Sequence, residues 1–166
     1  MNGKIIFWEY IKMIDVAVRV IDCHVVYINK KKERLFLSLK RSQKERYPNI
    51  WQCVTGGILN QENPEQTAIR ELFEETGLTP KRMWSIETVN YYYDPKYSTM
   101  NLIPVFGVEV DEINITLSDE HQEYLWGIDK EIESILFWRQ QKIGVKIFSE
   151  MLNEGYDKLL LSEIRV

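Results

Sequence analysis

Residues 55–79 read T-G-G-I-L-N-Q-E-N-P-E-Q-T-A-I-R-E-L-F-E-E-T-G-L-T, and this stretch predicts the helix around which the rest of the chain is organised. Asn63 offers a capping side chain, a proline follows it at the first helical position, and Gln66 supplies the reciprocal partner of a capping box. Gly77, with a second proline shortly after it, is typical of a helix end. We therefore expect a helix over residues 64–76.

The predicted helix has an apolar stripe on one side and an acidic face on the other. The stripe consists of Ala68, Ile69, Leu72 and Phe73. Glu71, Glu74 and Glu75 stand at i, i+3 and i+4, so their carboxylates converge and repel one another. A cluster of hard oxygen ligands without Cys or His suits Mg²⁺ or Mn²⁺. The alternative is a solvated helix face without a ligand.

The spacing of the fixed residues carries more information than the acidic face alone. From Gly56 the order is glycine, five residues, Glu62, seven residues, Arg70-Glu71-Leu72, one residue, Glu74-Glu75, one residue, Gly77-Leu78. This order resembles the box of the Nudix hydrolases and matches it at every fixed position. The resemblance implies an α/β fold, a Nudix-type α/β/α sandwich with a mixed sheet, and a pyrophosphohydrolase that acts on phosphoanhydrides.

The same resemblance implies roles for individual residues. Matching positions make Glu71, Glu74 and Glu75 ligands of Mg²⁺ (or Mn²⁺), and Glu120 an outlying metal ligand or base. Arg70 would orient the glutamates, with Glu62 bonded to it. The implied catalytic residues are Arg70, Glu71, Glu74 and Glu120, and the implied structural supports are Gly56 and Glu62.

Two departures and two flanking segments bear on the substrate. Many relatives carry a glutamate where this chain has Leu59 and a glycine where it has Gln61, so the loop is expected to hold its metals differently. W-Q-C-V-T-G at residues 51–56 and S-D-E-H-Q-E-Y-L-W at residues 118–126 are similar to family members that act on dihydroneopterin triphosphate or dATP. This implies a small-molecule nucleotide or pterin triphosphate partner.

Other functions stay open at this point. One is hydrolysis of a nucleoside diphosphate linked to another group, or of a capped or triphosphorylated RNA end. The acidic balance and the lack of a basic stripe disfavour long RNA and nucleic acid in general. Another is a non-catalytic nucleotide-sensing Nudix module, which would be expected to lose box glutamates that this chain keeps.

Composition sets the outer limits. The 166 residues, 45% hydrophobic and 12% aromatic, predict a single globular domain over residues 1–166, with residues 1–13 as an extension and 154–166 as a tail. The net charge of −4 argues against a surface that coats nucleic acid. No apolar run has the length of a membrane span. Cys23 and Cys53 read as buried free thiols, which predicts a cytoplasmic protein, and Met13 is an alternative start.

The rest of the chain predicts the elements of the sandwich. The expected strands are residues 14–29, 35–39, 82–94, 101–110, the edge-like 111–117 and 124–126, and the expected helices are 129–135 and 137–153. The stripe expected to be buried in the last helix is Ile143, Ile147, Phe148, Met151 and Leu152. The apolar tail either docks as a strand or mediates self-association, so a homodimer stays open.

Five residues are candidates for binding the substrate. Lys40 and Arg41 close a predicted strand beside a loop, where cations can meet phosphate oxygens, although ordinary surface charges would look the same. Trp51 precedes the glycine turn. Tyr91 and Tyr93 share one face of a strand, so either could stack on a base or pterin ring.

Overall fold

The strand β2 (Val20–Ile28) lies at the centre of a mixed sheet. It pairs in parallel with β7 (Thr99–Val110) along one edge and antiparallel with β3 (Arg34–Arg41) and β5 (Val54–Gly57) along the other. The computed structural model describes residues 14–166, except the side chains of residues 156–158. The expected extension and the alternative start at Met13 lie outside the described residues.

Within residues 14–166 nine strands join this sheet, whose main path runs β4-β3-β2-β7-β6-β9, with β1, β5 and β8 paired to β7, β2 and β3. The remaining strands are β1 (Asp15–Val18), β4 (Trp51–Gln52), β6 (Arg82–Asp94), β8 (His121–Gly127) and β9 (Glu163–Ile164). The predicted hairpin between β2 and β3 and the predicted strand over residues 82–94 are confirmed.

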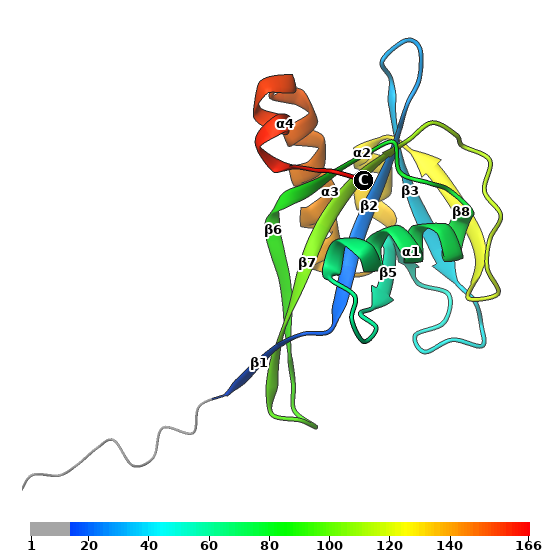
Figure 1. Cartoon of the computed structure of the whole chain (residues 1–166). Helices are drawn as coiled ribbons and strands as arrows, with labels where there is room; N and C mark the ends of the chain where they lie inside the picture. The colour runs from blue at the N-terminus through cyan, green and yellow to red at the C-terminus, as the bar shows by residue number, and fades with distance from the viewer. Residues whose placement is uncertain (1–13) are drawn as a thin grey trace, which may run out of the picture.

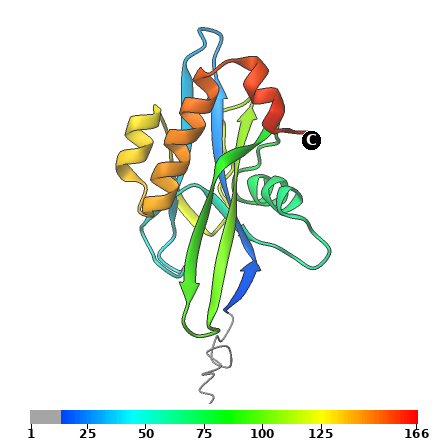
Figure 2. The same cartoon turned by 90° about the vertical axis from the view of Figure 1, so that its left-hand side faces the viewer.

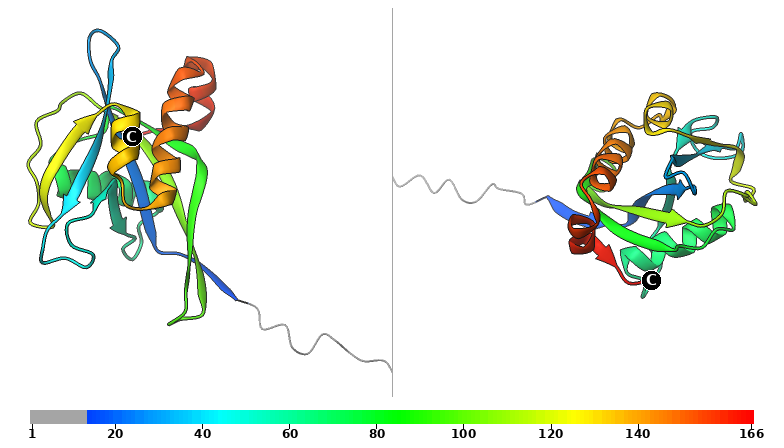
Figure 3. Two further views of the ribbon diagram at one scale, coloured as in Figure 1. Left: turned by 180° about the vertical axis from the view of Figure 1, so that it is seen from behind. Right: turned by 90° about the horizontal axis from the view of Figure 1, so that it is seen from above.

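Helices cover both faces of the sheet, which confirms the predicted α/β/α sandwich. The helix α1 (Pro64–Thr76) lies on one face, and α2 (Asp129–Ile135) and α3 (Arg139–Asn153) lie on the other (Figures 1 and 2). The short α4 (Tyr156–Ser162) packs beside α3 and leads into β9, which pairs with β6 (Figure 3). The tail therefore docks as a strand, one of its two expected outcomes. Within the described residues no helix has the length and hydropathy to span a membrane.

Alternation along β2 divides the interior into two cores. Ile21, Cys23 and Val25 point to the core under α1. The intervening Asp22, His24 and Val26 are also buried, and Val26 belongs to the core under α2 and α3. Cys23 and Cys53 are buried free thiols, as predicted.

The long strand expected over residues 14–29 is wrong in one respect, because it is interrupted at Arg19. The ladder with β7 shifts by one residue there: Val18 pairs with Leu102, whereas Asp22 pairs with Val105. The carbonyl of Arg19 accepts instead from the amide of Ile58. Both segments thus pair with β7, and the register changes where β5 joins the other edge of the strand.

The strand expected over residues 111–117 is also wrong, because this segment has no strand pairing. Its backbone is used by the helix end: the amide of Thr116 donates to the carbonyl of Thr76 (2.9 Å). Ile115 and Leu117 still pack against the core under α1. Alternate residues of the segment thus pack against the core, as in a strand, but its backbone bonds the end of a helix instead of another strand.

Two helix stripes are rotated from their expected positions. Phe73 is 58% exposed, and Glu75 lies on the buried side of α1 in its place. In α3 Ile143 is 44% exposed, and Val145 is buried instead. Phe148, Met151 and Leu152 are buried and Ile147 is partly buried, as expected.

Candidate active site

The helix α1 begins and ends where its sequence predicts. The Asn63 side chain accepts from the Gln66 amide (2.9 Å), and the Gln66 side chain accepts from the Asn63 amide (3.0 Å), which completes the capping box. Gly77 ends the helix with a left-handed φ of 73°, which glycine adopts without strain. These caps hold the box residues on a rigid element.

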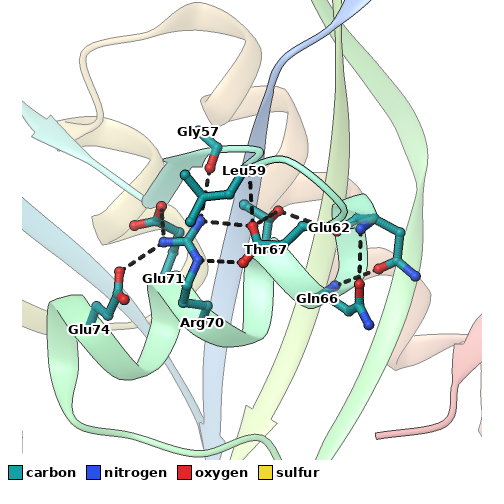
Figure 4. Close-up of polar contacts among 9 residues, drawn as sticks. Gly57, Leu59, Glu62, Gln66, Thr67, Arg70, Glu71 and Glu74 are labelled. Carbon is teal, nitrogen blue, oxygen red and sulfur yellow. Dashed lines mark hydrogen bonds and ion pairs between the residues drawn. The ribbon is translucent and has the colours of Figure 1, made fainter.

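Arg70 is the centre of the polar contacts on α1 (Figure 4). Its Nε donates to Glu62 Oε1 (2.8 Å) and its Nη2 to Glu62 Oε2 (3.1 Å) and to the Gly57 carbonyl (2.8 Å). Its Nη1 donates to Glu71 Oε1 (2.7 Å) and to Glu74 Oε2 (2.8 Å). The expected contact between Arg70 and Glu62 is therefore present, and one guanidinium orients two glutamates of the acidic face.

The two hydrogen bonds between Arg70 and Glu62 strongly lower the pKa of the Glu62 carboxyl group. Hydrogen bonds from Arg70 lower the pKa of Glu62 to about 2, with smaller contributions from Thr67 and the Leu59 amide. The same bonds raise the pKa of Arg70. Both groups stay charged at any pH at which the protein would work.

Gly56 lies directly against the Glu71 side chain. A Cβ at Gly56 would come within 1.9 Å of the Glu71 Cδ, which no real contact allows. The paired Gly57 has open space at the same position. Any side chain at the first glycine of the box would therefore displace the Glu71 carboxyl group.

Glu75 is the most buried of the three box glutamates, with 3% of its surface exposed. Burial raises its pKa to about 7, and the neighbouring charges of Glu71 and Glu120 act in the same direction, while His121 opposes them. The His121 Nε2 lies 3.2 Å from Glu75 Oε1. Glu75 Oε2 is buried and has no hydrogen-bond partner among the described residues.

Glu71 and Glu120 extend the acidic cluster towards the surface. Burial raises the pKa of Glu71, against the effect of Arg70 and with added repulsion from Glu74 and Glu120. Glu120 therefore lies close enough to interact with both Glu71 and Glu75. Its loop is fastened to α1 by the Ser118 amide, which donates to the Glu75 carbonyl (3.3 Å).

The donor set fits a hard divalent cation. The ligands on offer are carboxylate oxygens, and Glu75 Oε2 is a buried oxygen that no described protein group satisfies. Among the described residues no three acidic, His or Cys side chains already converge as a closed ligand set. Arg70 engages one oxygen each of Glu71 and Glu74, which leaves the other oxygen of each carboxylate without this contact and available to a cation.

The two candidate phosphate-binding cations have protein partners. Lys40 Nζ lies 2.8 Å from Glu123 Oε1 and 5.7 Å from the centre of the Trp51 ring. Arg41 donates to Glu45 Oε2 (2.9 Å) and to the Arg46 carbonyl (2.9 Å). Binding of a phosphate by either cation would have to compete with these contacts.

Trp51 is joined to aromatic residues that the sequence reasoning missed. Its carbonyl accepts from the Phe137 amide (2.9 Å), and the Phe137 and Trp138 rings lie 4.9 Å apart. Tyr47 adds a third ring, edge-on to Trp138 at 5.5 Å. We call Tyr47, Phe137 and Trp138 the aromatic rim; each is at least 38% exposed. The sequence signal for Phe137 and Trp138 was that two aromatic residues stand together before a helix, and Tyr47 had no such signal.

The aromatic rim and the acidic cluster are linked by two adjoining loops. The Ser42 amide donates to the Glu120 carbonyl (2.8 Å), and the Gln122 side chain donates to Asn49 Oδ1 (2.7 Å). The loop between Ser42 and Asn49 also carries Tyr47. Tyr47 of the rim and the backbone contact to Glu120 therefore belong to the same loop.

The candidate tyrosines lie on the long hairpin of β6 and β7, which projects past α1 (Figure 2). The Tyr91 amide donates to Gln140 Oε1 (2.8 Å), which places this part of β6 beside the first turn of α3. Tyr93 is two residues nearer the hairpin tip and is 48% exposed. No described contact joins either ring to the glutamates.

Comparison with known proteins adds the family. The NUDIX domain matches residues 19–140. Dihydroneopterin triphosphate diphosphatase of Haemophilus influenzae is 53% identical over 130 residues, which are 74% of this chain and 78% of that protein. RNA pyrophosphohydrolase of Wolbachia pipientis is 30% identical over 132 residues, 68% of this chain and 80% of that protein. The corresponding Baumannia cicadellinicola enzyme matches over 44 residues, only 28% of its length.

Solved structures agree on the fold. The E. coli dihydroneopterin triphosphate pyrophosphohydrolase superimposes with a TM-score of 0.62 at 21% identity, over 80% of this chain and 93% of that chain. At this identity the likeness concerns the fold alone.

Proposed function

Because the chain belongs to the NUDIX domain family, we propose that it is a Mg²⁺-dependent (or Mn²⁺-dependent) hydrolase that opens a phosphoanhydride bond of a pterin triphosphate or nucleoside triphosphate and releases pyrophosphate. The observation that carries the proposal is the contact of Arg70 with Glu71 and Glu74 beside the buried Glu75. The pterin preference is supported by the 53% identical relative, whose name specifies that substrate.

The charged residues of the site have different roles in the proposed hydrolysis. Glu71, Glu74, Glu75 and Glu120 would hold the cation, which when bound neutralises phosphate oxygens and activates water. Arg70 fixes the direction of the Glu71 and Glu74 carboxylates, so that little reorganisation is needed on binding. Glu120, on an anchored loop at the edge of the cluster, would accept the proton of the attacking water.

The aromatic rim supplies a surface for the ring of the substrate. Heteroaromatic rings stack on exposed aromatic side chains with about 1–3 kcal/mol each. Tyr47, which contacts Trp138, belongs to the loop that is hydrogen-bonded to Glu120. Lys40, which lies beside Trp51, would add a cation for the phosphate groups of the substrate. Tyr91, Tyr93 and Arg41 remain further candidates.

A substrate panel with Mg²⁺ tests the proposal, with release of pyrophosphate and of phosphate measured separately. Dihydroneopterin triphosphate and dATP are the expected substrates. Triphosphorylated RNA belongs in the panel because three RNA pyrophosphohydrolases are among the relatives. Absence of turnover with every nucleotide, pterin, dinucleotide and RNA substrate would overturn the enzyme assignment.

Single substitutions test the site itself. Glu74→Gln and Glu75→Gln should each lower kcat by on the order of 10² or more, as expected for loss of a charge-stabilising group. Wild-type rates in both variants would place the metal elsewhere.

A further inference from the structure

His121, the first residue of β8, is a buried residue whose ring faces the acidic cluster. It is 5% exposed, and its Nε2 lies 3.2 Å from Glu75 Oε1. Neither ring nitrogen has an aligned hydrogen bond among the described residues. The backbone around it is well anchored, since its amide donates to the Ser118 carbonyl (3.2 Å). The backbone therefore fixes the position of the ring, while both ring nitrogens lack a hydrogen-bond partner among the described residues.

Unpartnered buried polar atoms gather around this ring. In the described part of the chain eight buried side-chain atoms have no hydrogen-bond partner, and five of them belong to Ser42, Glu75, Ser118 and His121. Backbone bonds join these segments, from Ser42 to Glu120 and from Ser118 to Glu75. Each such atom has lost its hydration without gaining a hydrogen bond in return, which destabilises the fold. A chain selected for stability alone would not concentrate these costs at one place.

Three of the unpartnered atoms lie elsewhere, one each in His24, Trp84 and Asn101, but the buried Asp22 carboxylate has partners on both oxygens. Asp22 is buried on the opposite face of β2, and its two oxygens accept from Asn90 (2.6 Å) and Gln141 (3.0 Å). Cys53 adds a further hydrogen bond to the same carboxyl group. The contrast indicates that the unpartnered atoms at Glu75 belong to a site that a ligand completes.

We propose that His121 is a positioning residue for Glu75: when the cation site is filled, its Nε2–H donates to Oε1, 3.2 Å away, and keeps Oε2 turned towards the cation. This inference rests on the proposed function. Arg70 already orients Glu71 and Glu74 but has no contact with Glu75 in the described structure. His121 supplies the missing donor from β8, so that each of the three box glutamates has its own fixed direction.

The alternative is that His121 merely fills space beneath the loop. The two readings predict opposite results when the ring nitrogens are removed. If His121 only packs, His121→Phe should leave metal affinity unchanged. If His121 positions Glu75, the same substitution should weaken metal binding, because Oε1 loses its donor.

Three variants separate these readings. Mn²⁺ affinity of the full chain is measured by electron paramagnetic resonance, and thermal unfolding is measured with EDTA. His121→Phe should raise the Mn²⁺ dissociation constant about 10- to 100-fold, the usual effect of losing a group that orients a metal ligand. His121→Gln, which restores an N–H near the Nε2 position, should stay within about fivefold of wild type. His24→Gln is the matched control, because His24 is also buried with an unpartnered Nε2 but packs against Gly144 of α3.

The unmodified protein offers a second measurement. The chain has only two histidines, so the imidazole ¹⁵N spectrum contains two rings. Addition of Mg²⁺ should shift the Nε2 signal of His121 and leave that of His24 unchanged. Wild-type Mn²⁺ affinity in folded His121→Phe, or unchanged His121 signals in Mg²⁺-saturated protein, would overturn the positioning role alone. A wild-type chain that binds no Mn²⁺ and hydrolyses no substrate would overturn the proposed function with it.

Discussion

The α-carbon of Gly56 lies so close to the Glu71 carboxyl group that a Cβ would stand 2.0 Å from Cγ and 2.1 Å from Oε1. Gly56 pairs with Ile21 of β2, and Glu71 is bonded to Arg70. The strand end and the helix are therefore in direct contact at the acidic face. A side chain on the strand could be accommodated only by moving the carboxylate.

Gly56→Ala should therefore displace Glu71 from Arg70 and lower kcat at least tenfold, with a smaller effect on the thermal midpoint. The matched control is Gly57→Ala, whose Cβ would meet nothing within 4 Å and whose rate should stay within about twofold of wild type. Steady-state kinetics at saturating Mg²⁺ measures both. Equal losses in the two variants would contradict the steric explanation.

Glu62→Gln should destabilise the fold near neutral pH and have little effect in strong acid. Arg70 lowers the pKa of Glu62 to about 2 from an ordinary value of 4.5. The ion pair therefore stabilises the folded state above pH 4.5, and this contribution is lost as pH falls towards 2. The difference in urea midpoint between wild type and variant should be largest near pH 6 and vanish near pH 2. A difference that is independent of pH would show that the charge of Glu62 is not responsible.

Glu75→Gln should stabilise the metal-free protein at alkaline pH while abolishing turnover. Burial raises the pKa of Glu75 to about 7, so between pH 4.5 and 7 the folded state binds more protons than the unfolded state. The free energy of unfolding of the wild type then falls over that range, by at most about 3 kcal/mol. With EDTA the variant should exceed the wild type in urea midpoint at pH 8 and match it at pH 4. A less stable variant at pH 8 would contradict this.

Trp138→Ala should raise KM for ring-bearing substrates roughly 5- to 150-fold, the equivalent of about 1–3 kcal/mol of stacking, with a smaller change in kcat. Hydrolysis of inorganic tripolyphosphate, which has no ring, serves as the internal control and should not change. Tyr93→Ala is the matched comparison on the hairpin. A rise in KM for Tyr93→Ala but not for Trp138→Ala would place the ring on the hairpin instead.

Short-range features of the fold could be predicted because they depend on neighbouring residues. The cap at Asn63, the left-handed Gly77 and the partnership of Glu62 with Arg70 all lie within one helix and its flanking loop. The same holds for the turn between β2 and β3, where the Asn29 side chain accepts from the backbone amides of Lys31 and Glu33.

Long-range features could not be predicted, because the hydrophobic periodicity of a segment does not show which distant segment it will contact. The alternation at residues 111–117 predicted a strand and could not show that Thr116 would bond a helix end while Ile115 and Leu117 pack against the core. Nor could spacing show that Glu75 would be buried against His121. Buried polar pairs of this kind form where two segments meet, and neither segment alone contains a signal for them.

Glu75 and Ser118 are 43 residues apart in the sequence, so at about 5–20 residues per second they leave the ribosome about 2–9 s apart. During this interval α1 can form with its caps, but Glu75 has neither the loop that buries it nor the imidazole beside it. The emerging chain thus carries a complete box before the proposed cation site can be closed. On the proposed function, Mg²⁺ would assist the last stage of folding only after His121 has been synthesised.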